Sequence, residues 1–345
     1  MIIQKVMKDV FPYHPIERSS NAKIPHNNGI RVIKRHEYKI INGISITGDA
    51  PKALVRIYDY QNDSYIRKSK PCTWPMYIAK TGHKWYPIES LTEYLLNQLG
   101  QIFGLKMAES GIVQISGQIR FLSRYFLNYS CEELVHGADI FAGYVNDKDF
   151  VVDIEKEQLS RDLFTLQFVE NSFESFFPFQ KEELMSEFVR LLLFDALVGN
   201  NDRHFYNWGV IRRLDESNSP TFSPIYDTAR GLFWNVSEDR LKWRHSLKNE
   251  EKKRYITKYA NDSKPKIGWE GESNINHFKL VEKIYKNEFY LSKIQQKELF
   301  LHANFERMLL AIQRDFKKYF SNERICLISS LLEHRYSTIQ NIISL

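Results

Sequence analysis

The chain has 345 residues, of which 43% are hydrophobic, 26% charged and 14% aromatic. This composition is that of a globular protein with a substantial core, and it excludes wholesale disorder. The net charge of +6 is too small to establish a nucleic-acid partner, so we expect no direct nucleic-acid binding.

The compartment is indicated by the cysteines and by the apolar runs. The three cysteines are far apart, so the sequence encodes neither a disulfide framework nor a zinc site. No apolar run reaches the roughly 18 residues that a membrane-spanning helix needs, and the first residues lack the apolar segment of a signal peptide. We therefore expect a cytoplasmic protein without membrane contact.

The first third of the chain has the pattern of a small β-rich lobe. Residues 1–43 mix prolines and asparagines with basic residues, which predicts an irregular lead-in. In residues 44–127, apolar runs predict short strands at 53–58, 76–80, 111–116 and 119–126. Leucines at helical spacing between the second and third runs predict a helix over 89–103 that ends at Gly104.

Helical patterns dominate residues 128–345. They predict helices over 155–169 and 181–198, the second one buried because it is apolar nearly all round, and a helical cap over 277–345. A strand-rich part followed by a helix-rich part predicts an α+β fold with two lobes and a ligand cleft between them.

The most informative motif follows the predicted buried helix. Asp202 and Asn207 are five residues apart, and Asp227 follows 20 residues later, after a predicted hairpin over 208–225. This spacing is typical of a kinase catalytic loop, in which a carboxylate lies near the attacking hydroxyl and hard oxygen ligands hold Mg²⁺. The alternative is that residues 199–202 are only a polar turn at a helix end.

The first lobe offers matching features. Lys80 ends a predicted strand and Glu93 follows 13 residues later in the predicted helix, which is how a kinase lysine and its orienting glutamate are arranged. Small residues at 45–52 form a loop whose amides could cradle phosphates, with Lys52 adding charge. The alternatives are an ordinary surface lysine and glutamate, and a simple hairpin turn.

Taken in order, these blocks resemble the HipA-like serine/threonine kinases of bacterial toxin–antitoxin systems, which are distant relatives of protein and phosphoinositide kinases. The resemblance covers about residues 44–235. Its three blocks are a Ser-x-x-Gly-x-x-x-Lys loop at 45–52, a Glu-Tyr helix segment at 93–94 followed by Phe-Gly-Leu at 103–105, and the catalytic and metal-binding blocks at 199–207 and 226–227. The resemblance implies a bilobed protein-kinase-like fold, with a small β-rich N-lobe (44–127), a helical C-lobe (128–345) and an ATP cleft between them.

The resemblance also implies roles for individual residues. Asp202 is expected to be the catalytic base, Asn207 and Asp227 the Mg²⁺ ligands, and Lys80 the residue that contacts the ATP phosphates, with Glu93 as its ion-pair partner. Further nucleotide contacts are expected from Thr47, Gly48, Asp49, Ala50 and Lys52, and adenine contacts from backbone groups of Ser123 and Tyr125. Ser45 occupies the position of the loop serine that family members autophosphorylate.

Two departures from the family pattern accompany these roles. Ser123 stands where the family has an acidic residue, and Phe126-Leu127 replace its Asp-Arg pair. Only 44 residues precede Ser45, whereas larger members carry an N-terminal subdomain there. Another chain would then have to provide that subdomain, or it is dispensable.

The resemblance predicts an ATP- and Mg²⁺-dependent kinase that phosphorylates serine or threonine of a protein target, as the toxin of a toxin–antitoxin system. The partners that it implies are the protein substrate, a small DNA-binding antitoxin and a separately encoded N-terminal subdomain. Two alternatives stay open: a kinase of a small molecule or lipid headgroup, and a non-catalytic ATP-binding regulatory subunit.

Overall fold

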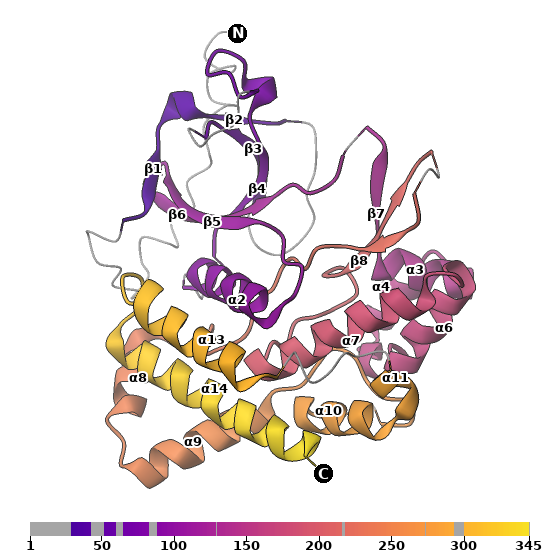
Figure 1. Ribbon diagram of the computed structural model, residues 1–345, viewed down its shortest axis with the longest axis vertical. Coiled ribbons are helices and arrows are strands. Elements are labelled where there is room, and N and C mark those ends of the chain that lie inside the picture. The colour runs from indigo at the N-terminus through magenta and orange to yellow at the C-terminus, as the bar shows by residue number, and fades with distance from the viewer. Residues whose placement is uncertain are drawn as a thin grey trace.

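The computed structural model describes residues 29–42, 52–59, 65–82, 88–128, 130–215, 218–272, 274–292 and 300–344. In this part of the chain, a curled β-sheet lies on one side of a larger group of helices (Figure 1). The prediction of an α+β fold with a strand-rich and a helix-rich part is confirmed. None of the described helices combines the length and the apolar character that crossing a bilayer requires.

The N-terminal lobe is a six-stranded sheet in the order β1-β5-β6-β4-β3-β2. Its strands are β1 (Arg31–Ile33), β2 (Tyr38–Ile40), β3 (Lys52–Ile57), β4 (Met76–Lys80), β5 (Ser110–Ile115) and β6 (Gln118–Arg124). β1 pairs with β5 in parallel, and the other neighbours are antiparallel.

One face of this sheet forms the core of the N-terminal lobe. The side chains of Val55, Ala79 and Ile115 are fully buried in it. Because side chains alternate along a strand, Lys52 and Lys80 lie on the opposite face of β3 and β4 from this core. The two lysines are thereby directed toward the helical lobe.

The irregular lead-in predicted for residues 1–43 is wrong for residues 31–40. β1 and β2 lie there and form the two edges of the sheet. Each strand has only three residues, which is too short for an alternating pattern to show in the sequence. The four predicted strands at 53–58, 76–80, 111–116 and 119–126 are confirmed as β3 to β6 within about two residues at each end.

The helix α2 (Glu89–Phe103) joins the two lobes. It ends, as predicted, at Gly104, which has the left-handed φ of 91° that glycine adopts readily. The leucines of α2 belong to the same buried core as the helical lobe. On another side, the Tyr94 ring lies 5.5 Å from the ring of Phe316 near the C-terminus. Helix α2 is therefore fixed to the helical lobe although it follows the sheet in sequence.

The helical lobe is built around α7 (Lys181–Val198), whose side chains are buried along almost its whole length. The other helices are α3 (Gly137–Val145), α4 (Phe150–Lys156), α5 (Ser160–Leu163), α6 (Leu166–Phe176), α8 (Glu238–His245), α9 (Asn249–Asp262), α10 (His277–Lys286), α11 (Glu288–Ser292), α13 (His302–Asp315) and α14 (Asn322–Ile343). The predicted buried helix and the helical C-terminal region are confirmed in the described residues.

Two features of this lobe differ from the helical pattern. The helix predicted over 155–169 is divided into α4, α5 and the start of α6. Gln158, between α4 and α5, has a left-handed φ of 61°, and the Thr165 hydroxyl caps α6 by accepting a hydrogen bond from the Phe168 N–H. The lobe also contains a small sheet of β7 (Glu132–His136), β8 (Gly209–Arg213) and β9 (Thr221–Phe222). β8 and β9 form the predicted hairpin.

Gly199 ends α7 and directs the chain into the segment that contains Asp202. It has a left-handed φ of 68°, and a Cβ built there would lie 3.2 Å from the Arg335 guanidinium. We therefore expect Gly199→Ala to lower the free energy of unfolding in urea by about 1–2 kcal/mol. Gly111→Ala is the matched control, because its Cβ meets nothing within 4 Å. Equal urea midpoints for the two variants would contradict the strain at Gly199.

Candidate active site

Arg203 holds the two predicted catalytic blocks together. It is almost fully buried and pairs with Asp195 of α7, with 2.9 Å between Nε and Oδ2. Its NH1 donates both to the Asn207 carbonyl at 3.0 Å and to the Tyr226 carbonyl at 2.9 Å. A buried arginine anchored on α7 therefore fixes the end of the first block beside the start of the second.

A second hydrogen bond lies within the loop between α7 and β8. The Asn207 side chain donates from Nδ2 to the Asp202 carbonyl at 2.7 Å. The side-chain Oδ1 of Asn207 makes no hydrogen bond within the described residues, so it remains an available oxygen ligand. The same loop carries His204, whose Nδ1 accepts a hydrogen bond from the Tyr206 N–H at 3.2 Å.

The state of His204 follows from its surroundings. Burial lowers the pKa of His204 to about 4, and the nearby Asp227 only partly offsets this effect. The imidazole is therefore neutral near neutral pH, with Nδ1 as the acceptor and the proton on Nε2. Because its Nδ1 accepts a hydrogen bond from the Tyr206 N–H, His204 helps to shape the loop.

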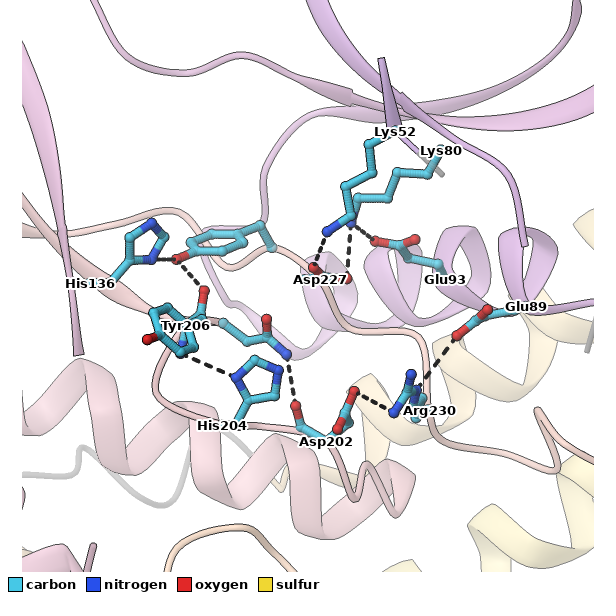
Figure 2. Close-up of polar contacts among 12 residues, drawn as sticks. Lys52, Lys80, Glu89, Glu93, His136, Asp202, His204, Tyr206, Asp227 and Arg230 are labelled. Carbon is cyan, nitrogen blue, oxygen red and sulfur yellow. Dashed lines mark hydrogen bonds and ion pairs between the residues drawn. The ribbon is translucent and has the colours of Figure 1, made fainter. Parts of the chain in front are cut away.

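A four-residue ion-pair cluster lies where the two lobes meet, and Figure 2 shows its members converging from the sheet, α2 and the segment after β9. The Lys80 amine lies 2.7 Å from Glu93 Oε1 and 3.0 Å from Asp227 Oδ1. The Lys52 amine lies 3.2 Å from Asp227 Oδ2. The spacing of Lys80 and Glu93 in the sequence thus corresponds to a direct contact.

The cluster fixes the charges of Asp227 and Lys80. Burial alone would raise the pKa of Asp227, but Lys80 and Lys52 outweigh it and hold that pKa well below its usual range. Burial alone would lower the pKa of Lys80, but Asp227 and Glu93 raise it above its usual range. Asp227 is therefore an anion and Lys80 a cation throughout the physiological pH range.

A small cavity lies beside the cluster. It has a volume of about 10 Å³, which is room for roughly one water molecule. Its lining residues come from both lobes: Glu93, Asn97, Met107, Phe121, Ser123, Ile225, Tyr226, Asp227 and Thr228. A larger cavity of about 250 Å³ opens beside the segment after β6, where Trp74, Met76, Tyr125 and Leu127 are among the lining residues.

The two residues expected at adenine lie at the end of β6. Ser123 is buried in this strand, and its backbone pairs with β4 on one side and β5 on the other. The Tyr125 N–H donates to the Met76 carbonyl at 2.9 Å and is thus engaged by the sheet. Within the described residues, the amides of Phe126 and Leu127 make no hydrogen bond.

Most of the expected phosphate loop lies outside the residues that the structure describes. Ser45, Thr47, Gly48, Asp49 and Ala50 lie outside the described residues. Lys52, at the end of that loop, is described and contacts Asp227 directly.

Two described residues, Asp227 of the cluster and Asn207 of the neighbouring loop, offer hard oxygen atoms of the kind that Mg²⁺ prefers. The described residues contain no group of three or more His, Cys, Asp or Glu side chains placed to hold a metal ion. Mg²⁺ is usually held by one or two protein oxygens together with substrate phosphates. The Asp227 carboxylate and the Asn207 amide oxygen fit this requirement.

Sequence reasoning missed three charged residues of the site. Arg230 pairs with Asp202, with 3.1 Å between NH1 and Oδ2, and its Nε lies 3.6 Å from Glu89 Oε1. Lys266 also acts on the charge of Asp202. Glu89 was detectable in principle, because it precedes Glu93 by four residues and so shares its helix face. Nothing in the sequence pairs Arg230 or Lys266 with Asp202.

Known proteins similar to this chain are described as kinases. A Haemophilus influenzae protein named "Putative kinase" is 24% identical over 191 residues, which are 54% of this chain and 52% of that protein. The chain thus spans about half the length of this curated relative. A second relative, from Sinorhizobium fredii, is 36% identical over 55 residues, which are 16% of this chain and 13% of that protein.

One solved structure shows the same fold, and a second was also found to align with the chain. The structure of the Helicobacter pylori proinflammatory kinase CtkA aligns with a TM-score of 0.68 at 18% identity, over 91% of this chain and 97% of that one. HipA of Shewanella oneidensis, solved with HipB and operator DNA, aligns with a TM-score of 0.47 at 11% identity, over 100% of this chain and 72% of that one. The likeness to CtkA confirms the predicted kinase-like fold.

The family is shown by a match to a family model. The model described as the HipA-like C-terminal domain matches residues 44–289. This range includes Lys80 and Glu93 as well as the segment from Asp202 to Asp227. Since the match covers well over half of the chain, the protein belongs to the HipA-like C-terminal domain family.

Proposed function

We propose that the protein is an ATP- and Mg²⁺-dependent kinase that phosphorylates a serine or threonine hydroxyl of a protein target. The observation that carries this proposal is the ion-pair cluster of Lys52, Lys80, Glu93 and Asp227 beside the Asp202 loop. The contact between Lys52 and Asp227 joins residues that are 175 positions apart in the sequence. Such convergence is what positioning one nucleotide between two lobes requires.

Asp202 is the proposed catalytic base. Its carboxylate would accept the proton of the acceptor hydroxyl while the hydroxyl oxygen bonds to the γ-phosphorus and the bond to the β-phosphate oxygen breaks. The Asn207 amide fixes the loop of this base by donating to the Asp202 carbonyl. The base is thus held in place by the residue that also offers an oxygen to the metal.

Asp227 and Asn207 are the proposed Mg²⁺ ligands. When bound, Mg²⁺ neutralises charge on the β- and γ-phosphate oxygens. Lys80, oriented by Glu93, would contact these phosphates, and Lys52 would add charge at the end of the phosphate loop. For this, the two lysines exchange contacts with Asp227 for contacts with the phosphates.

The remaining nucleotide contacts are also proposals. Thr47, Gly48, Asp49 and Ala50 would supply loop amides, and Ser45 would be the autophosphorylated residue. Adenine would lie near Ser123 and Tyr125. Because the sheet already engages the Tyr125 N–H, the next two amides, of Phe126 and Leu127, are the better hydrogen-bond donors for it.

The biological setting follows from the family resemblance. We propose that the protein acts as the toxin of a toxin–antitoxin pair, with a small antitoxin as its partner. A separately encoded N-terminal subdomain is a further proposed partner.

The proposal is tested by incubating a cell lysate with γ-labelled ATP, Mg²⁺ and either the wild-type protein or Asp202→Ala. We expect label on serine or threonine of protein with the wild type and no label above background with the variant. Arg254→Gln is the control, because Arg254 is exposed on α9. Label confined to the lipid or low-mass fraction would instead identify a small-molecule or lipid kinase. Stabilisation by ATP without any transfer would identify a regulatory subunit.

A further inference from the structure

The positive charge of the chain is concentrated in one short segment. The whole chain has 48 basic and 42 acidic residues, and residues 240–258 contain eight of the basic residues but only two of the acidic ones. The remaining 326 residues therefore have 40 of each, so the net charge of +6 belongs to this segment alone. A charge that is small for the whole chain is thus strong locally.

This segment forms α8 and most of α9. Figure 1 shows both helices beside α14, away from the N-terminal sheet. The apolar side chains of Leu241 and Ile256 are buried in the helical lobe, which leaves the charged side chains at the surface. Of the eight basic side chains, only that of Lys258 forms an ion pair within the described residues.

One side of α8 combines two arginines with an exposed ring. Arg240, Trp243 and Arg244 are three and four residues apart, so they share this side. The Trp243 side chain is 54% exposed. The Arg244 guanidinium carbon lies 4.3 Å from the centre of the Trp243 ring and 4.2 Å from that of Tyr255 on α9. This stack holds the indole in place at the surface and joins α8 to α9.

One side of α9 continues the positive charge. Lys248, Lys252 and Tyr255 follow one another at four and three residues, so they share that side. Because Tyr255 stacks on Arg244, this side adjoins the one on α8. Glu251 lies close to it, but its carboxylate accepts a hydrogen bond from the Lys248 N–H at 3.3 Å and so caps its own helix. We define the basic–aromatic patch as Arg240, Trp243, Arg244, Lys248 and Lys252.

We propose that the basic–aromatic patch binds a single-stranded nucleic acid, with a base stacked on the Trp243 indole and phosphates beside the four cations. An aromatic ring among basic side chains is how single strands are bound without sequence preference. The bases of a duplex are stacked on one another and cannot cover an indole. This activity goes beyond the proposed kinase reaction and does not depend on it. It departs from the expectation of no nucleic-acid binding, which considered only the net charge of the whole chain.

An acidic protein segment and an anionic membrane fit the patch less well. Within residues 238–262, Trp243 is the one large apolar side chain that is exposed. Protein interfaces usually centre on several packed anchors, and a membrane-bound helix inserts a row of apolar side chains. A polyanion that carries planar bases therefore matches what the patch offers.

Fluorescence anisotropy with a fluorescein-labelled oligothymidine of about 20 nucleotides tests the inference. We expect the wild type to bind, with an affinity that falls as salt rises because phosphate contacts release counterions. Trp243→Ala should weaken binding by about tenfold, whereas Trp243→Phe, which keeps a ring, should bind nearly as the wild type does. A wild type that does not bind at low salt overturns the inference. So do equal affinities for the wild type and a natively folded Trp243→Ala.

Arg240→Gln and Lys248→Gln test the phosphate contacts. Each should reduce the slope of log affinity against log salt by about 0.7, the change expected for one contact to a single strand. Lys148→Gln is the matched control, because Lys148 is exposed before α4 and makes no ion pair within the described residues. Its slope should equal that of the wild type. Equal slopes for all three variants overturn the inference, and if Trp243→Ala does not fold, these slopes decide alone.

Competition identifies the class of polyanion. We expect an unlabelled single strand to displace the probe at a lower concentration of charge than a duplex of the same length, polyglutamate or vesicles containing phosphatidylserine. Stronger displacement by the duplex, by polyglutamate or by the vesicles overturns the inference and identifies a duplex, an acidic protein or a membrane as the partner. No ATP is present in these experiments, so their outcome is separate from that of the kinase assay.

Discussion

Asp227→Asn is expected to lower kcat for phosphoryl transfer by about 10³-fold, and with it the stabilisation of the protein by Mg²⁺ and ATP. Asp227 is the residue on which Lys52 and Lys80 both converge, and it is the only carboxylate in the proposed pair of metal ligands. Its φ of 53° is left-handed, a conformation that asparagine tolerates as well as aspartate does. The loss therefore reports on the charge and not on the backbone.

The measurement combines initial rates with labelled ATP and thermal unfolding with and without Mg²⁺ and ATP. Asp215→Asn is the control, because Asp215 pairs with Arg213 on an exposed turn away from the cluster. Equal rates for Asp227→Asn and Asp215→Asn would show that the cluster is a structural ion-pair network only.

Arg203→Met is expected to lower the free energy of unfolding by about 3–5 kcal/mol, because it leaves the Asp195 carboxylate buried without its cation. Both side chains of this pair are only 1% exposed. The substitution also removes the donor that holds the Asn207 and Tyr226 carbonyls. Urea unfolding followed by tryptophan fluorescence measures the loss.

The matched control for this variant is Arg213→Met. Arg213 pairs with Asp215 at the surface, and we expect the urea midpoint of Arg213→Met to equal that of the wild type. A midpoint for Arg203→Met that also equals the wild type would show that the buried pair does not stabilise the lobe. Contacts other than those of Arg203 would then have to hold the loops of Asn207 and Asp227 in place.

The fold was predictable where periodicity extends over several residues. The strands β3 to β6 and the helices α2 and α7 were found in this way, because each is long enough for burial to mark alternate or helical positions. The edge strands β1 and β2 have three residues each and each contains a basic residue, so their pairing depends on the rest of the sheet. The start of α6 within the helix predicted over 155–169 depends on one capping hydroxyl, that of Thr165.

Part of the site was predictable because some of its residues are close together in the sequence. Asp202 and Asn207 lie in one loop, and Lys80 and Glu93 lie in a strand and in the helix that follows it. Contacts set by the tertiary fold were missed. The pairs of Arg230 with Asp202 and with Glu89 join residues from different elements, and no sequence pattern relates them. The same holds for Lys52, whose amine reaches Asp227 across the two lobes.

The most direct test of the proposed kinase activity is a single-turnover assay. Excess protein is mixed with γ-labelled ATP and Mg²⁺, for the wild type and for Asp202→Asn in parallel. If Lys80, Asp202 and Asp227 act on one triphosphate, the wild type transfers the label to a protein hydroxyl and Asp202→Asn does not. Transfer of label by Asp202→Asn at the wild-type rate would contradict the role of Asp202 as the base. A wild type that binds ATP and transfers nothing to any acceptor would contradict the kinase activity itself.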